Sequence, residues 1–138
     1  MARMNRLIAL FACLLMAAIC GCSRKQSDAS KLHEYVKITS ITPPVTQPLH
    51  IGQTVEISID VTYQLNAQTG TVDIITQASD ATPISQDMRV INKGQGTERL
   101  TTRFVVPKTN AIEVLSTVFH EGAQESSVVD SRYMKVDP

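Results

Sequence analysis

The chain has 138 residues, enough for one domain of ordinary size. Thirteen basic and thirteen acidic side chains give a formal net charge of zero, and 43% of the residues are hydrophobic. There is no excess of positive charge of the kind that accompanies nucleic-acid binding, so no nucleic-acid partner is expected.

The first 21 residues have the pattern of a secretory signal peptide. Arg3 and Arg6 form a positive segment, and residues 7–19 are an unbroken apolar run. This run is shorter than the ~20 apolar residues that a membrane-spanning helix needs. Export followed by cleavage is therefore predicted, with an uncleaved anchor helix as the alternative. Removal of the two arginines leaves eleven basic side chains against thirteen acidic ones, a mildly acidic mature chain.

The end of this segment, Ile19-Cys20-Gly21-Cys22, resembles the lipobox of bacterial lipoproteins. In that motif an aliphatic residue and two small residues precede the acylated cysteine. Cys22 fits the acylated position better than Cys20, which bulky Ile19 would directly precede. The resemblance implies cleavage before Cys22, acyl chains such as palmitate on that residue, and stable membrane anchoring. By the enteric-type sorting rule, Ser23 implies the outer membrane, facing the periplasm.

Cysteine usage limits the chemistry of the mature chain. All three cysteines, Cys13, Cys20 and Cys22, lie at or before the predicted cleavage site. Since the one remaining thiol would carry lipid, neither a disulfide nor a thiolate metal site is expected. Residues 22–34 are predicted to be a lipidated flexible tether, because residues 23–34 are polar and lack an apolar period. The folded domain is expected at residues 35–138.

Alternation of apolar and polar residues predicts strands throughout this domain. In Thr54–Leu65 six apolar residues alternate with polar ones, which would place all six on one face of a half-buried strand. Weaker copies of this pattern predict further strands at Thr71–Ala78, Ile84–Ile91, Thr97–Val106 and Val128–Val136.

Two other segments have distinctive patterns. Tyr35–Ile41 is predicted to be the first strand, and Pro43-Pro44 after it indicates an edge strand that stops or switches sheet, because proline lacks a ladder donor. Ile112–Phe119 is apolar on both sides. This pattern predicts a central strand that is covered on two faces.

Turn-forming residues separate the predicted strands at Asn66–Gly70, Ser79–Pro83, Asn92–Gly96, Pro107–Asn110 and Glu121–Ser126. About seven short strands without a helical period predict an all-β fold, an antiparallel two-sheet sandwich. The pattern over residues 35–136 resembles immunoglobulin-like and fibronectin-type-III-like modules, although it lacks the antibody-type Cys…Trp…Cys set. A small closed barrel is the structural alternative.

No motif predicts a catalytic, metal or cofactor site. The histidines His33, His50 and His120 fall in the tether, a loop and a strand end, without the spacing of a zinc or copper site. Gly94-Gln95-Gly96 is followed by Arg99 where a dinucleotide loop has its third glycine, and no Gly-x-Ser-x-Gly elbow occurs. A Ser-His-Asp set that assembles only in space stays open as a hypothesis.

Two groups of charged residues are further candidates. Asp80 and Asp87 flank a predicted loop and could contact calcium, although no Asp-x-Asp-x-Asp-Gly loop is present. A basic stripe for an acidic partner or lipid headgroups could form from Arg89, Lys93, Arg99 and Arg103. The alternative is that these residues form a solvated sheet surface and guard against edge pairing.

These features predict a non-catalytic binding or adaptor module, held at the membrane by lipid on Cys22, with another envelope protein as partner. The contact is expected at the loops Asn66–Gly70, Asn92–Gly96 and Glu121–Ser126, or at an open edge strand. One alternative is an inhibitor of a periplasmic or foreign hydrolase. Another is a small-ligand binder, which would need a pocket with convergent polar groups.

Overall fold

A computed structural model describes residues 33–120 and 128–138. The predicted signal peptide, Cys22, most of the tether and the predicted Glu121–Ser126 turn lie outside these residues. The described chain contains six strands, β1 Tyr35–Thr42, β2 Leu49–His50, β3 Thr54–Ala78, β4 Pro83–Val105, β5 Ala111–Phe119 and β6 Val128–Asp137. No helix of the described residues is long and apolar enough to cross a membrane.

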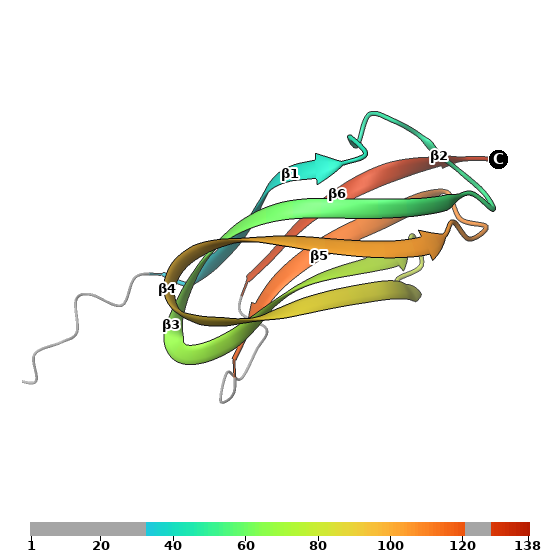
Figure 1. The fold of residues 1–138 in the computed structure, drawn as a ribbon. Helices are drawn as coiled ribbons and strands as arrows, with labels where there is room; N and C mark the ends of the chain where they lie inside the picture. Colours follow the sequence, from blue (N-terminus) through green and yellow to red (C-terminus); the bar gives the residue numbers. More distant parts are fainter. Residues whose placement is uncertain (1–32, 121–127) are drawn as a thin grey trace, which may run out of the picture. The chain divides into compact units, whose positions relative to one another are not determined.

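The strands form two layers (Figure 1). The long strands β3 and β4 bend together, so that one half of each strand lies in each layer. In what we name the first sheet, residues 54–65 of β3 pair with β1 on one side and with residues 94–105 of β4 on the other. In the second sheet, residues 69–78 of β3 pair with residues 83–92 of β4 and with β5, which pairs with β6. The predicted all-β, immunoglobulin-like two-sheet sandwich is confirmed.

Two of the predicted turns, Asn66–Gly70 and Asn92–Gly96, are wrong. Both segments lie within the ladder between β3 and β4, and the register of that ladder shifts between Leu65 and Thr69. A bulge together with glycines allows paired strands to bend sharply, and strands can pass from one sheet to another at such corners. The predicted strands Thr54–Leu65 and Thr71–Ala78 are therefore both parts of β3. Likewise, the predicted strands Ile84–Ile91 and Thr97–Val106 both belong to β4. The other two turns within the described chain separate β3 from β4 and β4 from β5, as predicted.

The first strand is an edge strand that ends before the two prolines, as the sequence predicted. β1 pairs with β3 alone and ends at Thr42, directly before Pro43-Pro44. The chain then crosses to the second sheet, where β2 pairs in parallel with β6 through Leu49 and Val136. The first strand is thus an edge strand after which the chain switches sheet.

The core lies between the two sheets. From β3 it contains the six alternating residues that the sequence predicted, Val55, Ile57, Ile59, Val61, Tyr63 and Leu65. The second sheet contributes Val72, Ile74, Ile112, Val114, Val118 and Met134. Full burial of an aliphatic side chain of this size stabilises a fold by about 1.5–3 kcal/mol, so these layers hold the sandwich together without any disulfide among the described residues.

The first half of β4 is oriented differently from the prediction. Met88 and Val90, which were expected to face the core, point outward and are 52% and 77% exposed. The inward positions carry Ser85, Asp87 and Arg89. This half of β4 is a sheet edge, where inward-pointing charged residues discourage pairing with another chain. Alternation predicted the strand correctly, but it does not show which of the two alternating sets faces inward.

Candidate binding surface

The outer face of the second sheet carries most of the exposed apolar side chains of the described residues, and no other described strand covers it. Of the seven large apolar side chains exposed in the described residues, five lie here, namely Met88, Val90, Phe119, Val129 and Tyr133. Half-buried Ile75 and Leu115 are ladder partners at the centre of the same face. We name these seven residues the open face. Large exposed apolar patches are uncommon on monomeric proteins and often mark a contact with another molecule.

The open face contradicts one expectation for β5. The sequence predicted that Ile112–Phe119 is covered on both sides. β5 does lie between β3 and β6, but only its inner side is fully buried, through Ile112, Val114 and Val118. On its outer side Leu115 is half-buried and Phe119 is 49% exposed. The doubly apolar pattern therefore belongs to a central strand with an uncovered apolar side.

Asp73 and Glu113 lie on the same outer face, in rows with residues of the open face, and both carboxylates are hydrogen-bonded by their neighbours. Asp73 accepts hydrogen bonds from the amide and hydroxyl of Thr117, at 2.9 and 2.8 Å. Glu113 accepts hydrogen bonds from Tyr133 Oη at 2.6 Å and from Gln77 Nε2 at 2.8 Å. The hydrogen bond from Tyr133, aided by that from Gln77, holds the pKa of Glu113 below its ordinary value despite partial burial. The face thus offers apolar area with its charges already hydrogen-bonded.

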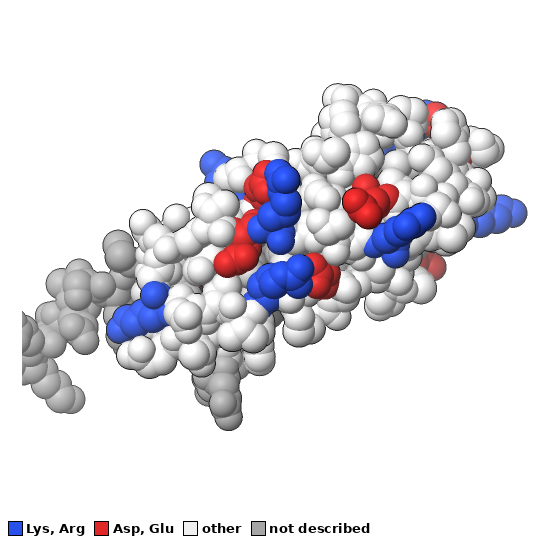
Figure 2. All heavy atoms as spheres, viewed as in Figure 1, with Lys and Arg blue, Asp and Glu red and all other residues white. Residues whose placement is uncertain are grey.

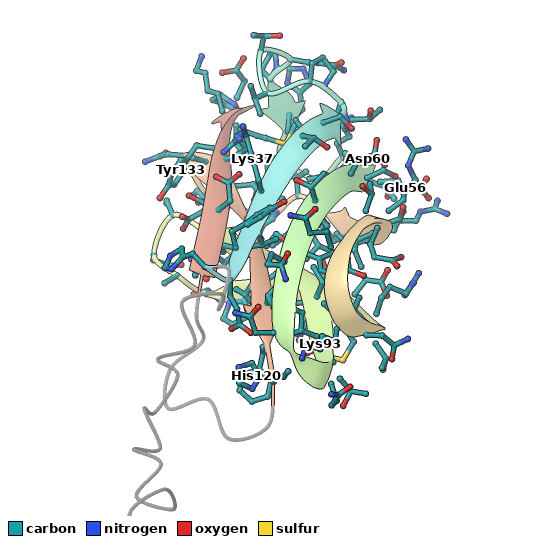
Figure 3. The ribbon with its side chains drawn as sticks, turned by 90° about the vertical axis from the view of Figure 1, so that its left-hand side faces the viewer. Lys37, Glu56, Asp60, Lys93, His120 and Tyr133 are labelled. Atoms are coloured by element: carbon teal, nitrogen blue, oxygen red, sulfur yellow. The ribbon has the colours of Figure 1, made fainter. Side chains whose placement is uncertain are left out.

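The outer face of the first sheet is charged instead. Lys and Arg side chains lie beside Asp and Glu side chains across it (Figure 2). Arg99 Nε donates to Asp60 Oδ1 at 2.7 Å. This hydrogen bond, with one from Ser40, lowers the pKa of Asp60 to about 2. Figure 3 shows Asp60 and Tyr133 on opposite sides of the domain. Paired surface charges of this kind are typical of a solvated face.

The basic residues that the sequence placed in one possible stripe are separated. Arg99 and Arg103 are on the first sheet, where Arg103 is the ladder partner of Glu56. Arg89 is on the edge of the second sheet and bonds Asp87 at 2.7 Å. The basic-stripe hypothesis is therefore not supported, because the cations are interleaved with carboxylates.

An Asp-x-Arg clamp closes the edge between β6 and β1. Asp130 Oδ2 accepts from the amide of Ile38 at 2.8 Å, and Arg132 Nη2 donates to the carbonyl of Ile38 at 3.1 Å. Arg132 Nη1 also donates to Asp130 Oδ1 and to the carbonyl of Ser131, at 2.6 and 2.7 Å. Side chains of one sheet thereby satisfy backbone groups of the other sheet.

The opposite edge has the same Asp-x-Arg arrangement. Asp87 Oδ1 accepts from the amide of Met88, and Arg89 Nη1 donates to the carbonyl of Met88. Asp87 Oδ2 also accepts from the amide of Thr101 in the first sheet at 3.3 Å. These side chains occupy backbone groups that an incoming strand would need, which disfavours strand addition at this edge. The open face is the better candidate for a contact than the edge strand that the sequence suggested.

The other sequence candidates do not form a site. His50 is in β2, while His120 follows β5 and lies 3.4 Å from Glu34. Asp80 accepts a hydrogen bond from the amide of Thr82 within its own turn, away from the Asp87 clamp. Within residues 33–120 and 128–138, no three His, Cys, Asp or Glu side chains gather as metal ligands would. Of the three loops expected to carry a contact, two are the bends of β3 and β4, and the third lies outside the described residues.

Comparison with known proteins identifies the fold only. No protein-family model matches the sequence, and no curated protein matches it. A glycosyl hydrolase family 2 member from Bacteroides cellulosilyticus aligns with 74% of this chain at a TM-score of 0.56 and 6% identity. A proposed β-galactosidase from Bacteroides fragilis aligns with 73% at 0.52 and 12%. The likeness is one of fold alone. The aligned regions span only 15% and 16% of those chains.

One smaller structure aligns over most of its own length. The CARDB domain of a Pyrococcus furiosus protein has a TM-score of 0.47 and 12% identity, with 75% of this chain and 85% of that chain covered.

Proposed function

We propose that this protein is a lipid-anchored component of the bacterial cell envelope whose β-sandwich is a non-catalytic, protein-binding module. The observation that carries the proposal is the open face, which holds five exposed apolar side chains together with half-buried Ile75 and Leu115. Aromatic residues and Met are enriched in protein interfaces, where charged side chains are depleted at the centre. The Asp-x-Arg clamps and the charged outer face of the first sheet leave the open face as the favoured contact.

In-cell crosslinking at native expression, followed by capture from solubilised membranes and mass spectrometry, tests this proposal. The full chain is expected to retain a protein partner that Val90→Lys loses, because a lysine would place an unpaired charge on the open face. Val105→Lys is the matched control, since Val105 is also exposed but lies on the outer face of the first sheet. Equal recovery from both variants would show that the open face is not the contact.

Anchoring is tested by Cys22→Ala in the full chain. If Cys22 carries the acyl chains, the variant leaves the membrane fraction and its N-terminal peptide lacks the mass of the lipid. Cys20→Ala is the control, because the lipobox resemblance makes Cys20 a part of the recognised motif and not the acylated residue. Loss of lipid in Cys20→Ala together with its retention in Cys22→Ala would overturn the assignment.

A second candidate function, small-ligand binding, is favoured by an open groove at the end of the domain opposite the bend of β3 and β4. The groove has a volume of about 510 Å³ and is lined partly by Ser79, Asp80, Lys108 and Asn110. This volume is within the range of small-molecule sites. A ligand that binds here would raise the midpoint of thermal unfolding. A screen of sugars, amino acids and carboxylates on the full chain should show a shift that Lys108→Ala abolishes and Lys93→Ala retains, and a silent screen would remove this candidate.

A further inference from the structure

We infer that the open face binds the open face of a second copy of this chain, forming a two-fold symmetric dimer on one membrane. The inference rests on the proposed function, because it names the partner of the same surface. Identical faces associate in this way only if they are self-complementary. The ladder registers of the second sheet determine which residues meet in such a dimer.

Consider a two-fold axis that runs along the strands, midway between β3 and β5. Each β3 residue pairs with one β5 residue within its own chain. In the dimer, this axis places the β3 residue of one copy opposite that same β5 residue of the other copy. Ile75 then faces Leu115, since these two residues are ladder partners. Met88 and Val129 lie in one row, because Met88 pairs with Asp73 and Val129 pairs with the ladder partner of Asp73. Met88 therefore faces Val129 at each flank of the interface. Beside the axis Ile75 and Leu115 form one apolar row, and the rows before and after it are polar.

The same axis keeps the carboxylates apart. Asp73 faces Thr117 of the second copy, and Glu113 faces Gln77, because these are ladder partners too. In each case a carboxylate meets a neutral hydrogen-bonding side chain. Like charges directly opposite each other would disfavour association, and here no carboxylate faces its own equivalent. Sheets pack face to face with strand directions within about 30°, so residues beside the axis are displaced little by the twist.

The orientation of the dimer suits two copies anchored in one membrane. Figure 1 shows that β1 begins at the end of the domain where β3 and β4 bend, and that the C-terminus lies at the other end. The chain before His33, which leads to Cys22, therefore joins the domain at the bend end. A two-fold axis along the strands places both bend ends on the same side. Both copies can then reach one bilayer through tethers of equal length.

The size of the face predicts where the dimer forms. The ladder between β3 and β5 joins eight residues of each strand, Thr71–Ala78 and Ile112–Phe119. With strands ~4.8 Å apart and a rise of ~3.4 Å per residue, the four strands offer a flat area of roughly 500 Å². A stable interface buries about 800 Å² per partner, so association in dilute solution is expected to be weak. Anchoring both copies in one leaflet raises their effective concentration and favours the dimer there.

Site-specific photocrosslinking of the full chain in cells tests the inference. A benzophenone amino acid replaces Phe119 on the open face or, as the control, Val105 on the outer face of the first sheet. We expect the probe at position 119 to give a product of twice the chain mass that contains peptides of this protein alone. The probe at position 105 should give at least roughly tenfold less of that product, which corresponds to a preference of about 1.4 kcal/mol.

A charge exchange between copies supplies a second, independent measurement. Ile75→Lys and Leu115→Glu each place a charge against an apolar residue, so either variant alone should lose most of the crosslinked dimer. When the two variants are co-expressed with different tags, Lys at position 75 of one copy faces Glu at position 115 of the other. The remaining Leu115 and Ile75 also face each other. Recovery of a mixed-tag dimer is expected, and copies that failed to fold could not give it.

The outcomes separate this inference from the proposed function. A crosslink from position 119 to a different protein, without the doubled mass, would overturn the dimer and support protein binding by the open face. No protein crosslink from position 119 would overturn both. A doubled mass with equal yield from positions 119 and 105, or no recovery in the mixed-tag experiment, would overturn the two-fold arrangement.

Discussion

Replacement of Arg132 by alanine is expected to lower the free energy of unfolding by about 1–2 kcal/mol. The substitution removes hydrogen bonds to Asp130, to Ser131 and to the carbonyl of Ile38, and it leaves a partly buried carboxylate without its cation. Hydrogen bonds that involve a charged group contribute about 1.5–3 kcal/mol, reduced here because water reaches both side chains. Urea denaturation followed by circular dichroism measures the effect.

Arg99→Ala is the matched control for this experiment. Arg99 also binds a carboxylate in a close ion pair, but its side chain is 71% exposed on the outer face of the first sheet and joins residues of the same sheet. Its urea midpoint should therefore stay near that of the unmodified protein. Equal destabilisation by the two substitutions would show that the clamp adds nothing beyond a surface ion pair.

The clamp also predicts a pH dependence. Burial opposes ionisation of Asp130, but hydrogen bonds from Arg132 and from the amide of Ile38 outweigh it and hold its pKa below the ordinary value of 3.8. Because the folded pKa is the lower one, the stabilisation is complete above the unfolded value and is lost as the pH falls through the folded value. The unmodified protein should have a higher free energy of unfolding than Asp130→Asn. This difference should be constant above pH ~5 and should shrink below pH 3.8. An advantage that grows on acidification would contradict this assignment.

Gly70→Ala is expected to destabilise the bend of β3 by about 1–3 kcal/mol, the usual cost of overpacking. A Cβ atom on Gly70 would lie 2.7 Å from the carbonyl oxygen of Phe119 and 3.1 Å from a methyl group of Leu65. The Phe119 carbonyl belongs to the ladder between β3 and β5, so it cannot move without disturbing the pairing of Thr71 with Phe119. Thermal and urea unfolding of the full chain measure the loss.

The neighbouring residue provides the control for this substitution. Thr69→Ala removes an exposed side chain in the same bend and should change the unfolding midpoint little. Gly70→Ala should also reduce crosslinking from position 119, because it shifts the strand end that carries Phe119. If Gly70→Ala is as stable as the unmodified protein, the bend is wider in solution than the ladder registers indicate.

Two glycine-containing segments show why the local sequence pattern predicted turns where the strands in fact continue. Asn66–Gly70 and Asn92–Gly96 have the composition of turns, and local chemistry alone predicts that each strand ends there. In the fold both segments lie within the ladder between β3 and β4, where Leu65 pairs with Gly94 and Thr69 with Asn92, so both strands continue through the bend. Gly96 is required for close approach, since a Cβ atom there would lie within 2.8 Å of three atoms of the Tyr63 side chain. Such an approach between residues far apart in sequence leaves no periodic signal.

The candidate surface could be predicted only in part for a related reason. The apolar outer side of Ile112–Phe119 is visible in the sequence, but the pattern is the same whether a second layer covers that side or not. The outward direction of Met88 and Val90 depends on which alternating set of β4 meets the core. Ser85, Asp87 and Arg89 can occupy the inward positions because this half of β4 is an edge, and edge position is a property of the assembled sheet.

The sequence by itself determined the all-β class, the strands outside the two bends except the short β2, and the proline-marked end of β1 to within one residue. These features depend on side-chain alternation and on proline geometry, which act within a few residues. Anchoring through Cys22 stays a prediction of its lipobox resemblance. Only the tertiary structure decided that β3 and β4 continue around a corner, that Asp-x-Arg clamps close both edges, and that no strand of the described residues covers the outer side of β5. Those outcomes arise from contacts between distant segments, whose partners and directions are settled only when the two sheets pack.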